Sequence, residues 1–327
     1  MSDSLPKVSI AGLRHGSEAR KQELSKLRQA GEGIGFFLVT DYEEDISPEL
    51  EDRAFDQARA LFNLPAASLQ SIALDRSRDP SNRGYEGLGA QSLDPRKASG
   101  GGDLNHSWRG NEDRDPDLDR FIPTPRPAWA VSYNQEVKWP AANELPDFKS
   151  TMLSYLRGNW KTAETIFGGI EDAFDMPPGH ISSKRTQPLD TLRLLWYPKM
   201  AAMQKGQAAC GFHTDFGTKT IVRRRGKGSL QVALRDGQII DVRPPAGCAI
   251  VNFGDMLQWW THGLIKSTPH GVRVGEDDIS LVVFCYADPW QELVDGKTAG
   301  DYQREKIMES YRHLSQGTGT SAVAETS

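Results

Sequence analysis

The order of apolar and polar positions divides the chain into a helical first half and a strand-rich second half. Apolar residues at helical spacing predict helices over residues 17–31, 47–62 and 146–167, and short strands are predicted at residues 8–10 and 34–39. From Thr191 onward, short apolar runs alternate with turns, and the predicted strands span residues 191–197, 209–215, 218–225, 229–234, 238–242, 248–253, 263–272 and 279–286. Eight short strands fit a double-stranded β-helix, or jelly roll, in which two sheets enclose a pocket.

Other segments lack this regular pattern. Residues 76–126 are rich in Gly, Asp, Arg and Pro and predict a long loop, and loops of that length are more often functional or disordered than neutral. A last helix is predicted at residues 302–313, and the Gly/Ser/Thr-rich residues 316–327 predict a disordered tail. We expect a mainly β fold with flanking helices (α+β). Its parts would be an N-terminal region of helices and the long loop (1–150), a long helix with the jelly-roll core (151–290), and a C-terminal helix and tail (291–327).

Composition narrows the class of protein. At 327 residues the chain can form one large or two closely packed domains. Its 39 Lys and Arg against 44 Asp and Glu give a net charge of −5, which argues against a nucleic-acid partner. The three cysteines lie in strand-like runs and predict buried free thiols in a reducing compartment. The start of the chain is not typical of a secretory signal, and no apolar run approaches the roughly 20 residues of a membrane span. We therefore expect a cytoplasmic protein without a membrane partner, monomeric or weakly homo-oligomeric, that acts on a small molecule.

One group of residues indicates metal chemistry. His213-Thr214-Asp215 is followed, 55 residues after Asp215, by His270. In an extended strand residues i and i+2 point to the same face, so His213 and Asp215 would project toward one ion. Two imidazoles and one carboxylate are the ligands that hold non-heme Fe(II) and leave coordination positions open. A single His-x-Asp also occurs by chance on protein surfaces, so the surrounding sequence is needed to distinguish a metal site from a chance pair.

The surrounding sequence supplies a series of short motifs in a fixed order. They are GFFLV (35–39), FNLP (62–65), NRGY (82–85), WP (139–140), LRLLWYP (192–198), HTDFG (213–217), GSLQV (228–232), VNFGD (251–255) and KSTPHGV (266–272). Together they resemble the isopenicillin N synthase-like family of Fe(II)/2-oxoglutarate-dependent oxygenases, over residues 6 to 290. The resemblance implies a jelly-roll fold, Fe(II) held by His213, Asp215 and His270 as the catalytic centre, 2-oxoglutarate as co-substrate, and O2.

The same resemblance suggests further site residues. Tyr197 and Ser280 match positions that contact a carboxylate of 2-oxoglutarate, although ordinary strand packing is the alternative for both. Arg83 matches an arginine that faces the substrate in some members, with Tyr85 close by in the same motif. A guanidinium is suited to grip a carboxylate, but a surface position in a polar loop explains Arg83 equally well.

One position departs from the family pattern. Members normally carry Arg-x-Ser after the second histidine, and that arginine holds the distal carboxylate of 2-oxoglutarate. Here the stretch reads Asp278-Ile279-Ser280, so a carboxylate stands where the arginine is expected. Asp278 would repel a dianionic co-substrate, so another cation has to compensate if 2-oxoglutarate is used.

The segment Lys219 to Arg225 contains the candidate cations. Its charges either face water at a strand end or include one that points into the pocket. Strand alternation separates Lys219, Ile221 and Arg223 from Thr220, Val222 and Arg224. The resemblance implies that Thr220 and Val222 face the pocket, which makes Arg224 the first candidate, ahead of Arg193 and then Lys219.

Three functions remain open from sequence. The first is an Fe(II)- and 2-oxoglutarate-dependent oxygenase that hydroxylates, desaturates or cyclises a small organic molecule, in a setting such as secondary metabolism. The second is an iron oxidase that does not use 2-oxoglutarate, and Asp278 is the reason to consider it. The third is a non-catalytic family member that serves as a binding module, against which the complete His-x-Asp and His set argues.

Overall fold

The computed structural model describes residues 5–74, 82–93, 102–112, 120–133, 136–187, 189–199, 209–226, 228–273 and 277–311. Its α-helices are α1 (Ile10–Arg14), α2 (Ser17–Glu32), α3 (Pro48–Phe62), α4 (Ala66–Ser71), α5 (Phe148–Ala173), α6 (Asp255–Trp260) and α7 (Ala299–Glu309). The 3-10 helices are η3 (Ala128–Tyr133) and η4 (Ser182–Lys184). The predicted tail at residues 316–327 lies outside the described residues.

The strands of the first half are β1 (Lys7–Ser9), β2 (Phe36–Thr40), β3 (Gly84–Glu86) and β4 (His106–Gly110). The strands of the second half are β5 (Thr191–Tyr197), β6 (Cys210–His213), β7 (Lys219–Gly226), β8 (Ser229–Ala233), β9 (Ile239–Val242), β10 (Ala249–Phe253), β11 (His270–Arg273) and β12 (Asp278–Cys285). A small hairpin, β13 (Glu292–Val294) and β14 (Lys297–Thr298), precedes α7.

Most predicted elements are present, and their ends have local causes. Helix α3 begins where the sequence indicated, because the Ser47 hydroxyl accepts a hydrogen bond from the Leu50 amide at 3.3 Å and Pro48 occupies the first turn. The predicted strand at 263–272 is shorter than expected and includes only the residues from His270 onward. The predicted loop at 76–126 is wrong in part, because β3 and β4 lie within it and pair with each other.

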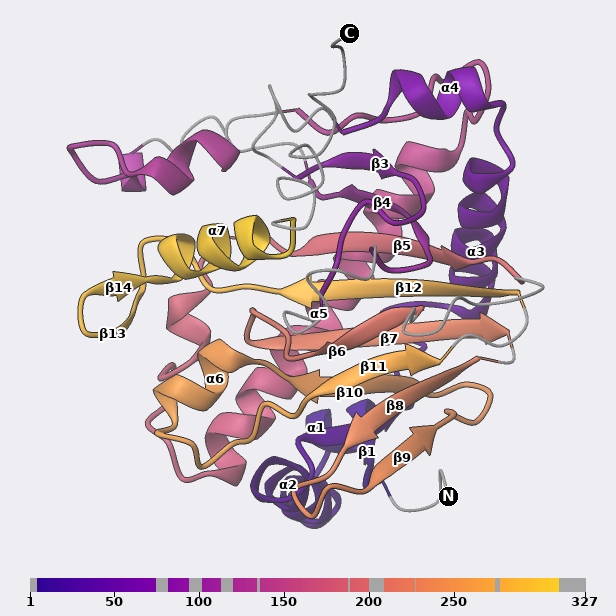
Figure 1. The fold of residues 1–327 in the computed structure, drawn as a ribbon. Helices are drawn as coiled ribbons and strands as arrows, with labels where there is room; N and C mark the ends of the chain where they lie inside the picture. Colours follow the sequence, from indigo (N-terminus) through magenta and orange to yellow (C-terminus); the bar gives the residue numbers. More distant parts are fainter. Residues whose placement is uncertain are drawn as a thin grey trace, which may run out of the picture.

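Two sheets form the core of the molecule (Figure 1). The larger sheet has eight strands in the order β1-β2-β10-β7-β12-β5-β4-β3, and the smaller sheet has four in the order β6-β11-β8-β9. All neighbouring strands within these sheets are antiparallel except β1 and β2. This two-sheet arrangement confirms the predicted jelly roll with flanking helices.

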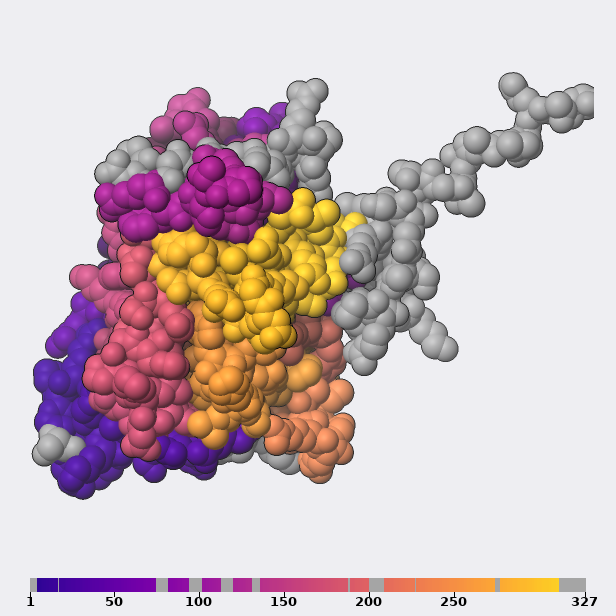
Figure 2. All heavy atoms as spheres, turned by 90° about the vertical axis from the view of Figure 1, so that its left-hand side faces the viewer, coloured from indigo at the N-terminus to yellow at the C-terminus, as the bar shows by residue number. Residues whose placement is uncertain are grey.

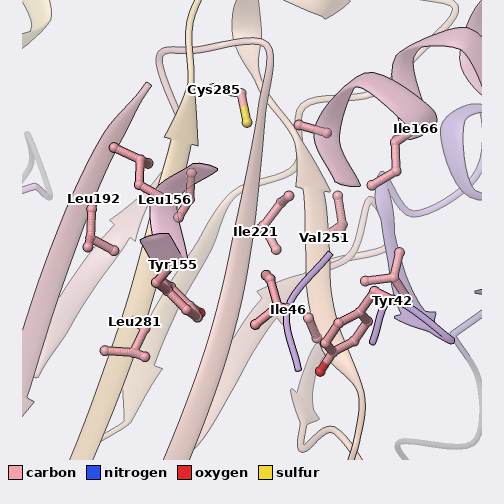
Figure 3. Close-up of a cluster of buried hydrophobic side chains, with 14 of the residues drawn as sticks. Tyr42, Ile46, Tyr155, Leu156, Ile166, Leu192, Ile221, Val251, Leu281 and Cys285 are labelled. Carbon is pink, nitrogen blue, oxygen red and sulfur yellow. The ribbon is translucent and has the colours of Figure 1, made fainter. Parts of the chain in front are cut away.

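Helices α2, α3 and α5 cover the outer face of the large sheet, and the main apolar core lies beneath them. Figure 3 shows Tyr155, Leu156 and Ile166 of α5 near Leu192, Ile221, Val251 and Leu281 of four neighbouring strands. Burial of this apolar surface is the main stabilising contribution to such a fold. The opposite face of the large sheet, turned toward the small sheet, is thereby left to form the pocket.

Strand β7 shows how alternation divides these two faces. Lys219, Ile221 and Arg223 are buried on the side of the helices, where the Lys219 Nζ donates to the Ala163 carbonyl of α5 at 3.0 Å. Thr220, Val222 and Arg224 line a cavity on the other side. The predicted phase of this strand is therefore confirmed.

Two further expectations can be compared with the structure. Cys210, Cys248 and Cys285 are free thiols, as predicted, but only Cys210 and Cys285 are buried, and Cys248 is partly exposed. None of the helices described here combines the length and the apolar character that crossing a bilayer requires.

Candidate metal centre and its two cavities

His213, Asp215 and His270 come together at one end of the small sheet. His213 ends β6 and His270 begins β11, and the two are direct partners across these antiparallel strands. The His213 and His270 Nε2 atoms lie 3.6 Å and 3.7 Å from the two Asp215 carboxylate oxygens. One ligand atom from each residue lies within 4.8 Å of the others. Two nitrogens and one carboxylate oxygen on one face match the donors and the open geometry of a non-heme Fe(II) site.

Backbone carbonyl groups orient both imidazoles. His213 Nδ1 lies 2.8 Å from the Gly211 carbonyl oxygen, and His270 Nδ1 lies 3.1 Å from the Thr268 carbonyl oxygen. A carbonyl oxygen can only accept, so Nδ1 carries a hydrogen in each ring, and in the neutral ring, the form that binds a metal, Nε2 keeps its lone pair. The lone pairs of both histidines therefore point toward the space beside Asp215, as metal binding requires.

The Asp215 carboxylate is held by two neutral donors. Its Oδ2 accepts hydrogen bonds from the Thr220 hydroxyl and from the Asn252 side-chain amide, the latter at 2.7 Å. Burial alone would raise the pKa of Asp215, but His270, His213 and the hydrogen bond from Asn252 outweigh it and hold that pKa well below its usual value. Asp215 is therefore ionised and available as a metal ligand.

The turn that carries Asp215 is fixed from behind by α6. The Asp255 amide donates to the Asp215 carbonyl at 2.9 Å, and the Met256 amide donates to the Gly217 carbonyl at 3.1 Å. The Asp255 carboxylate also accepts from the Thr214 hydroxyl at 3.0 Å and from the Tyr302 hydroxyl of α7 at 2.6 Å. These bonds connect the metal-binding turn to the C-terminal helix, so α7 supports the site as well as covering it.

An inner cavity runs from the triad between the two sheets. We give this name to the space of about 60 Å³ whose lining includes His213, Asp215, His270, Arg193, Leu195, Tyr197, Thr220, Val222, Arg224, Asn252, Ser280 and Val282. The predicted co-substrate residues Tyr197, Ser280, Arg224 and Arg193 thus all line the same space as the triad. Burial raises the pKa of Tyr197, so its phenol is neutral and can donate a hydrogen bond.

Arg224 and Asp278 form a buried ion pair at this cavity. Arg224 Nη2 lies 3.0 Å from Asp278 Oδ2, and the two side chains are 6% and 2% exposed. The same Asp278 oxygen accepts from the Gly228 amide at 2.9 Å. Arg224 pairs directly with Ser280 across β7 and β12, so the cation stands one strand away from the usual arginine position.

Part of the Arg224 guanidinium has no partner among the described residues. Its Nε and Nη1 are buried and make no hydrogen bond there. Buried donors of this kind are normally satisfied, so an acceptor is expected in the inner cavity.

The neighbouring basic residues of β7 are occupied elsewhere. Arg223 pairs with Glu51 at 3.1 Å and donates to Asn159 at 2.6 Å, on the side of the helices. Arg225 pairs with Asp52 at the surface. Lys219, the third candidate from sequence, is buried beneath α5 and does not line the inner cavity. Of the basic residues on β7, Arg224 alone lines this cavity.

A second, outer cavity also borders the triad. We use this name for the space of about 90 Å³ whose lining includes His213, Asp215, Asn82, Arg83, Gln91, Leu93, Arg109, Asn111, Trp129, Arg193, Phe216, Phe284, Tyr286, Gln303, Arg304 and Ile307. Arg193 and Phe284 line both cavities and mark their junction. Part of the wall comes from α7, which Figure 2 shows in yellow, directly beside the magenta segment that contains residues 120–133.

The two predicted substrate residues lie in different places. Arg83 lines the outer cavity. Tyr85 is not among the residues that line either cavity. Its hydroxyl lies 2.7 Å from His106 Nδ1, and its ring stacks on the His106 ring.

Sequence reasoning missed several residues of the site. It assigned no role to Asn252, Gln91, Asn111 or Gln303, and it interpreted Asp278 as a repulsive charge. Asn252 lies within a recognised motif, next to Phe253 and Gly254, so its position could have suggested a role. The other three come from segments without strand periodicity, and only the folded chain places them together.

Comparison with known proteins identifies the class. Residues 5–130 match the family model described as the N-terminal region of non-haem dioxygenase in morphine synthesis, and residues 190–287 match that of the 2OG-Fe(II) oxygenase superfamily. The chain belongs to the 2OG-Fe(II) oxygenase superfamily, in its isopenicillin N synthase-like arrangement. With its triad in place, it is a non-heme 2OG-Fe(II) dioxygenase.

Individual relatives are more distant. A validamycin A dioxygenase of Streptomyces hygroscopicus subsp. limoneus is 29% identical over 312 residues, covering 90% of this chain and 80% of the relative. The 2-oxoglutarate-dependent dioxygenase frbA of Dothideomycetidae sp. (strain 11243) is 26% identical over 348 residues, covering 94% and 97%. The crystal structure of a full-length Neurospora crassa protein in complex with alpha-KG superposes with a TM-score of 0.79 at 22% identity, covering 93% and 96%, which shows the shared fold.

Proposed function

We propose that this dioxygenase uses 2-oxoglutarate to oxidise a small organic molecule, and that Arg224 binds the distal carboxylate of the co-substrate. Hydroxylation, desaturation and ring closure are the outcomes that the site can support. Relatives described as a validamycin A dioxygenase and as 2-oxoglutarate-dependent dioxygenases support a role in secondary metabolism. The observation that carries the assignment of Arg224 is its pair of buried, unpartnered donors in a cavity shared with the iron ligands.

The residues present fit both groups that the family uses. His213, Asp215 and His270 would hold Fe(II), and Thr220 and Asn252 would keep Asp215 in its ligating orientation. Arg224 would bind the distal carboxylate, with Ser280 and Tyr197 as neutral donors beside it. When bound, Fe(II) and 2-oxoglutarate together supply the oxidation of a substrate C–H bond by O2, with loss of CO2 from the co-substrate.

Asp278 has a positioning role in this proposal. Its Oδ2 anchors Arg224 Nη2, which leaves Nε and Nη1 to donate toward the cavity. The Gly228 amide satisfies the same oxygen and helps to hold the carboxylate in place. The apolar residues Leu195, Val222 and Val282 line the same space, and a poorly hydrated wall strengthens charge-assisted hydrogen bonds. The charge that sequence interpreted as repulsive is thus paired with the proposed binding group.

The proposal is tested by titrating the Fe(II)-loaded protein with 2-oxoglutarate without oxygen, following the charge-transfer absorption of the complex. Arg224→Gln removes the cation and should weaken 2-oxoglutarate binding roughly 10- to 100-fold, since a hydrogen bond to a charged group contributes about 1.5–3 kcal/mol. Fe(II) affinity should change little. Arg225→Gln is the matched control, because it removes an adjacent arginine that faces solvent.

Two results would contradict the proposal in different ways. Equal binding by Arg224→Gln and the unchanged protein would remove Arg224 from the co-substrate site. Absence of 2-oxoglutarate binding to the unchanged protein, together with turnover that releases neither CO2 nor succinate, would support an iron oxidase that does not need this co-substrate.

A further inference from the structure

Arg193 is a buried cation at the junction of the two cavities. It lies on β5 and lines both the inner and the outer cavity together with His213 and Asp215. It is only 6% exposed. Burial lowers its pKa, and the nearby charge of Arg109 lowers that pKa further.

The charge of Arg193 is poorly compensated by the described residues. Its one hydrogen bond there is long, from Nη2 to the Ser107 hydroxyl at 3.4 Å, and its Nε is buried without a partner. Asp103 and Glu86 both lie near enough to influence it. Both Asp103 oxygens, however, already accept backbone amides, from Gly211 and Leu93, and Glu86 pairs with Arg109. No described carboxylate forms an ion pair with Arg193.

Two other buried arginines of this protein have charged partners. Arg109, which lines the same outer cavity, pairs with Glu86 and donates to Gln91 at 2.7 Å and to Asn82 at 2.9 Å. Arg185, with a side chain that is 0% exposed, pairs with Asp190 and Glu164. Removing a charge from water is costly unless an opposite charge is supplied. The contrast indicates that the counter-ion of Arg193 comes from a ligand.

The other residues that line the outer cavity indicate further properties of the ligand. Asn82, Gln91, Asn111 and Gln303 bring amide groups to its wall, and Phe216 and Phe284 bring aromatic rings. The only acid among its described lining residues is Asp215, which serves as an iron ligand. Such a wall suits a molecule with an apolar body, polar substituents and one negative charge.

We infer that the substrate carries a carboxylate that pairs with Arg193 in the outer cavity and thereby places its neighbouring carbon atoms beside the metal. This inference rests on the proposed function, because it assigns 2-oxoglutarate to Arg224 and leaves Arg193 for the substrate. The same chemistry could instead serve a carboxylate of 2-oxoglutarate, and the experiment separates the two sources.

The test compares a carboxylate with its neutral counterpart of similar shape. The full chain is loaded with Mn(II), which binds like Fe(II) without turnover, and saturated with 2-oxoglutarate. Phenylacetate and phenylacetamide are then titrated by calorimetry. We expect phenylacetate to bind at least tenfold more tightly than phenylacetamide, and Arg193→Gln to remove this preference while Arg225→Gln keeps it.

A stability measurement separates a ligand-binding role from a structural one. Because Arg193 lacks a charged partner, Arg193→Gln should leave the thermal unfolding midpoint unchanged or raise it. Arg109→Gln should lower the midpoint, because it leaves Glu86 buried without its cation. A fall in the Arg193 variant as large as that in the Arg109 variant would show that Arg193 is structural and overturn the inference.

Three further outcomes would each contradict the inference or the proposed function. Equal affinity for phenylacetate and phenylacetamide in the unchanged protein would overturn the inference without touching the proposed function. A loss of 2-oxoglutarate affinity in Arg193→Gln as large as that in Arg224→Gln would assign Arg193 to the co-substrate instead. If the unchanged protein does not bind 2-oxoglutarate at all, the proposed function fails, and the comparison is repeated with Mn(II) alone.

Discussion

The meaning of a single charged residue in this site depends on its neighbour across the sheet. Considered alone, the Asp278 carboxylate would repel a dianionic ligand. Paired with Arg224, the same carboxylate orients a cation. Strand alternation, together with the phase implied by the family resemblance, was enough to predict that Arg224, and not Arg223 or Arg225, faces the cavity. The pairing of Asp278 with Arg224 could not be predicted, because it depends on the register between β7 and β12.

This pair leads to a prediction about a double variant. Arg224→Gln alone should weaken 2-oxoglutarate binding, and adding Asp278→Arg should recover part of the loss, because a guanidinium returns to the position two residues before Ser280. Asp278→Arg alone should not tighten binding, since it breaks a buried ion pair and places two cations together. Calorimetric titrations of the four proteins form a complete cycle. A double variant no better than Arg224→Gln would show that the two positions do not share one function.

The residues behind the iron ligands lead to a second prediction. Asp215→Ala removes a ligand and should abolish turnover, as should His213→Ala or His270→Ala, with the fold largely retained. Asn252→Ala keeps every ligand but removes a hydrogen bond to Asp215, and should weaken Fe(II) binding roughly 10- to 100-fold. Turnover assays check the three ligand variants, and competition with a chelator measures the Fe(II) affinity of Asn252→Ala. Unchanged affinity in Asn252→Ala would mean that Thr220 alone fixes the carboxylate.

At the scale of elements, the strands of the second half were predictable and those of the 76–126 segment were not. The strands from β5 to β12 have their own apolar alternation and turn residues, so local sequence indicates them. Strands β3 and β4 are short and lie in a segment rich in Gly, Asp, Arg and Pro. They form because β5 offers a free edge, where His106 to Gly110 pair with Leu192 to Trp196. Pairing with the edge of a sheet depends on tertiary structure, so it cannot be predicted from the local sequence pattern.

The junction between β10 and α6 leads to a prediction about a glycine. A Cβ atom on Gly254 would lie 2.3 Å from the Gly217 carbonyl oxygen and 2.9 Å from the Asp215 carbonyl oxygen. Gly254→Ala should therefore displace the turn that carries Asp215, lower the thermal midpoint and weaken Fe(II) binding. Gly237→Ala is the control, because its positive φ of 85° makes the substitution unfavourable while nothing near the metal is touched. Equal Fe(II) affinities in the two variants would contradict this account.

At the scale of the whole molecule, the composition of the outer cavity could not be predicted. Its wall combines the segments around Asn82 and Asn111 with strand β5 and helix α7, which are far apart in sequence. The jelly roll, by contrast, follows from the order of its strands. A general framework was therefore predictable, while the surface that selects a substrate depends on how distant segments meet.

The contact between the helical layer and the large sheet leads to a prediction about alkaline stability. Tyr42 lies under the Arg223 guanidinium at 4.2 Å and donates to Glu51 at 3.2 Å, and burial raises its pKa from 10.0 to about 12. Between these values the unfolded chain loses the proton and the folded chain keeps it, so the free energy of unfolding falls as pH rises. Denaturant titrations from pH 10 to 12 should show a smaller fall in Tyr42→Phe. Parallel curves for the two proteins would contradict this assignment.

The ion pair of Arg224 and Asp278 also predicts which residues occur together at these two positions in related proteins. Either residue introduced alone into an ancestor with arginine at position 278 would give an unfavourable site. Asp278 without Arg224 leaves a buried anion, and two arginines together repel each other. The two substitutions, 54 positions apart, should therefore be found in the same proteins and not singly. Lineages in which a carboxylate has replaced the arginine before Ser280 should carry a basic residue at position 224, and the pair would then mark a branch of this superfamily that a search for Arg-x-Ser alone passes over.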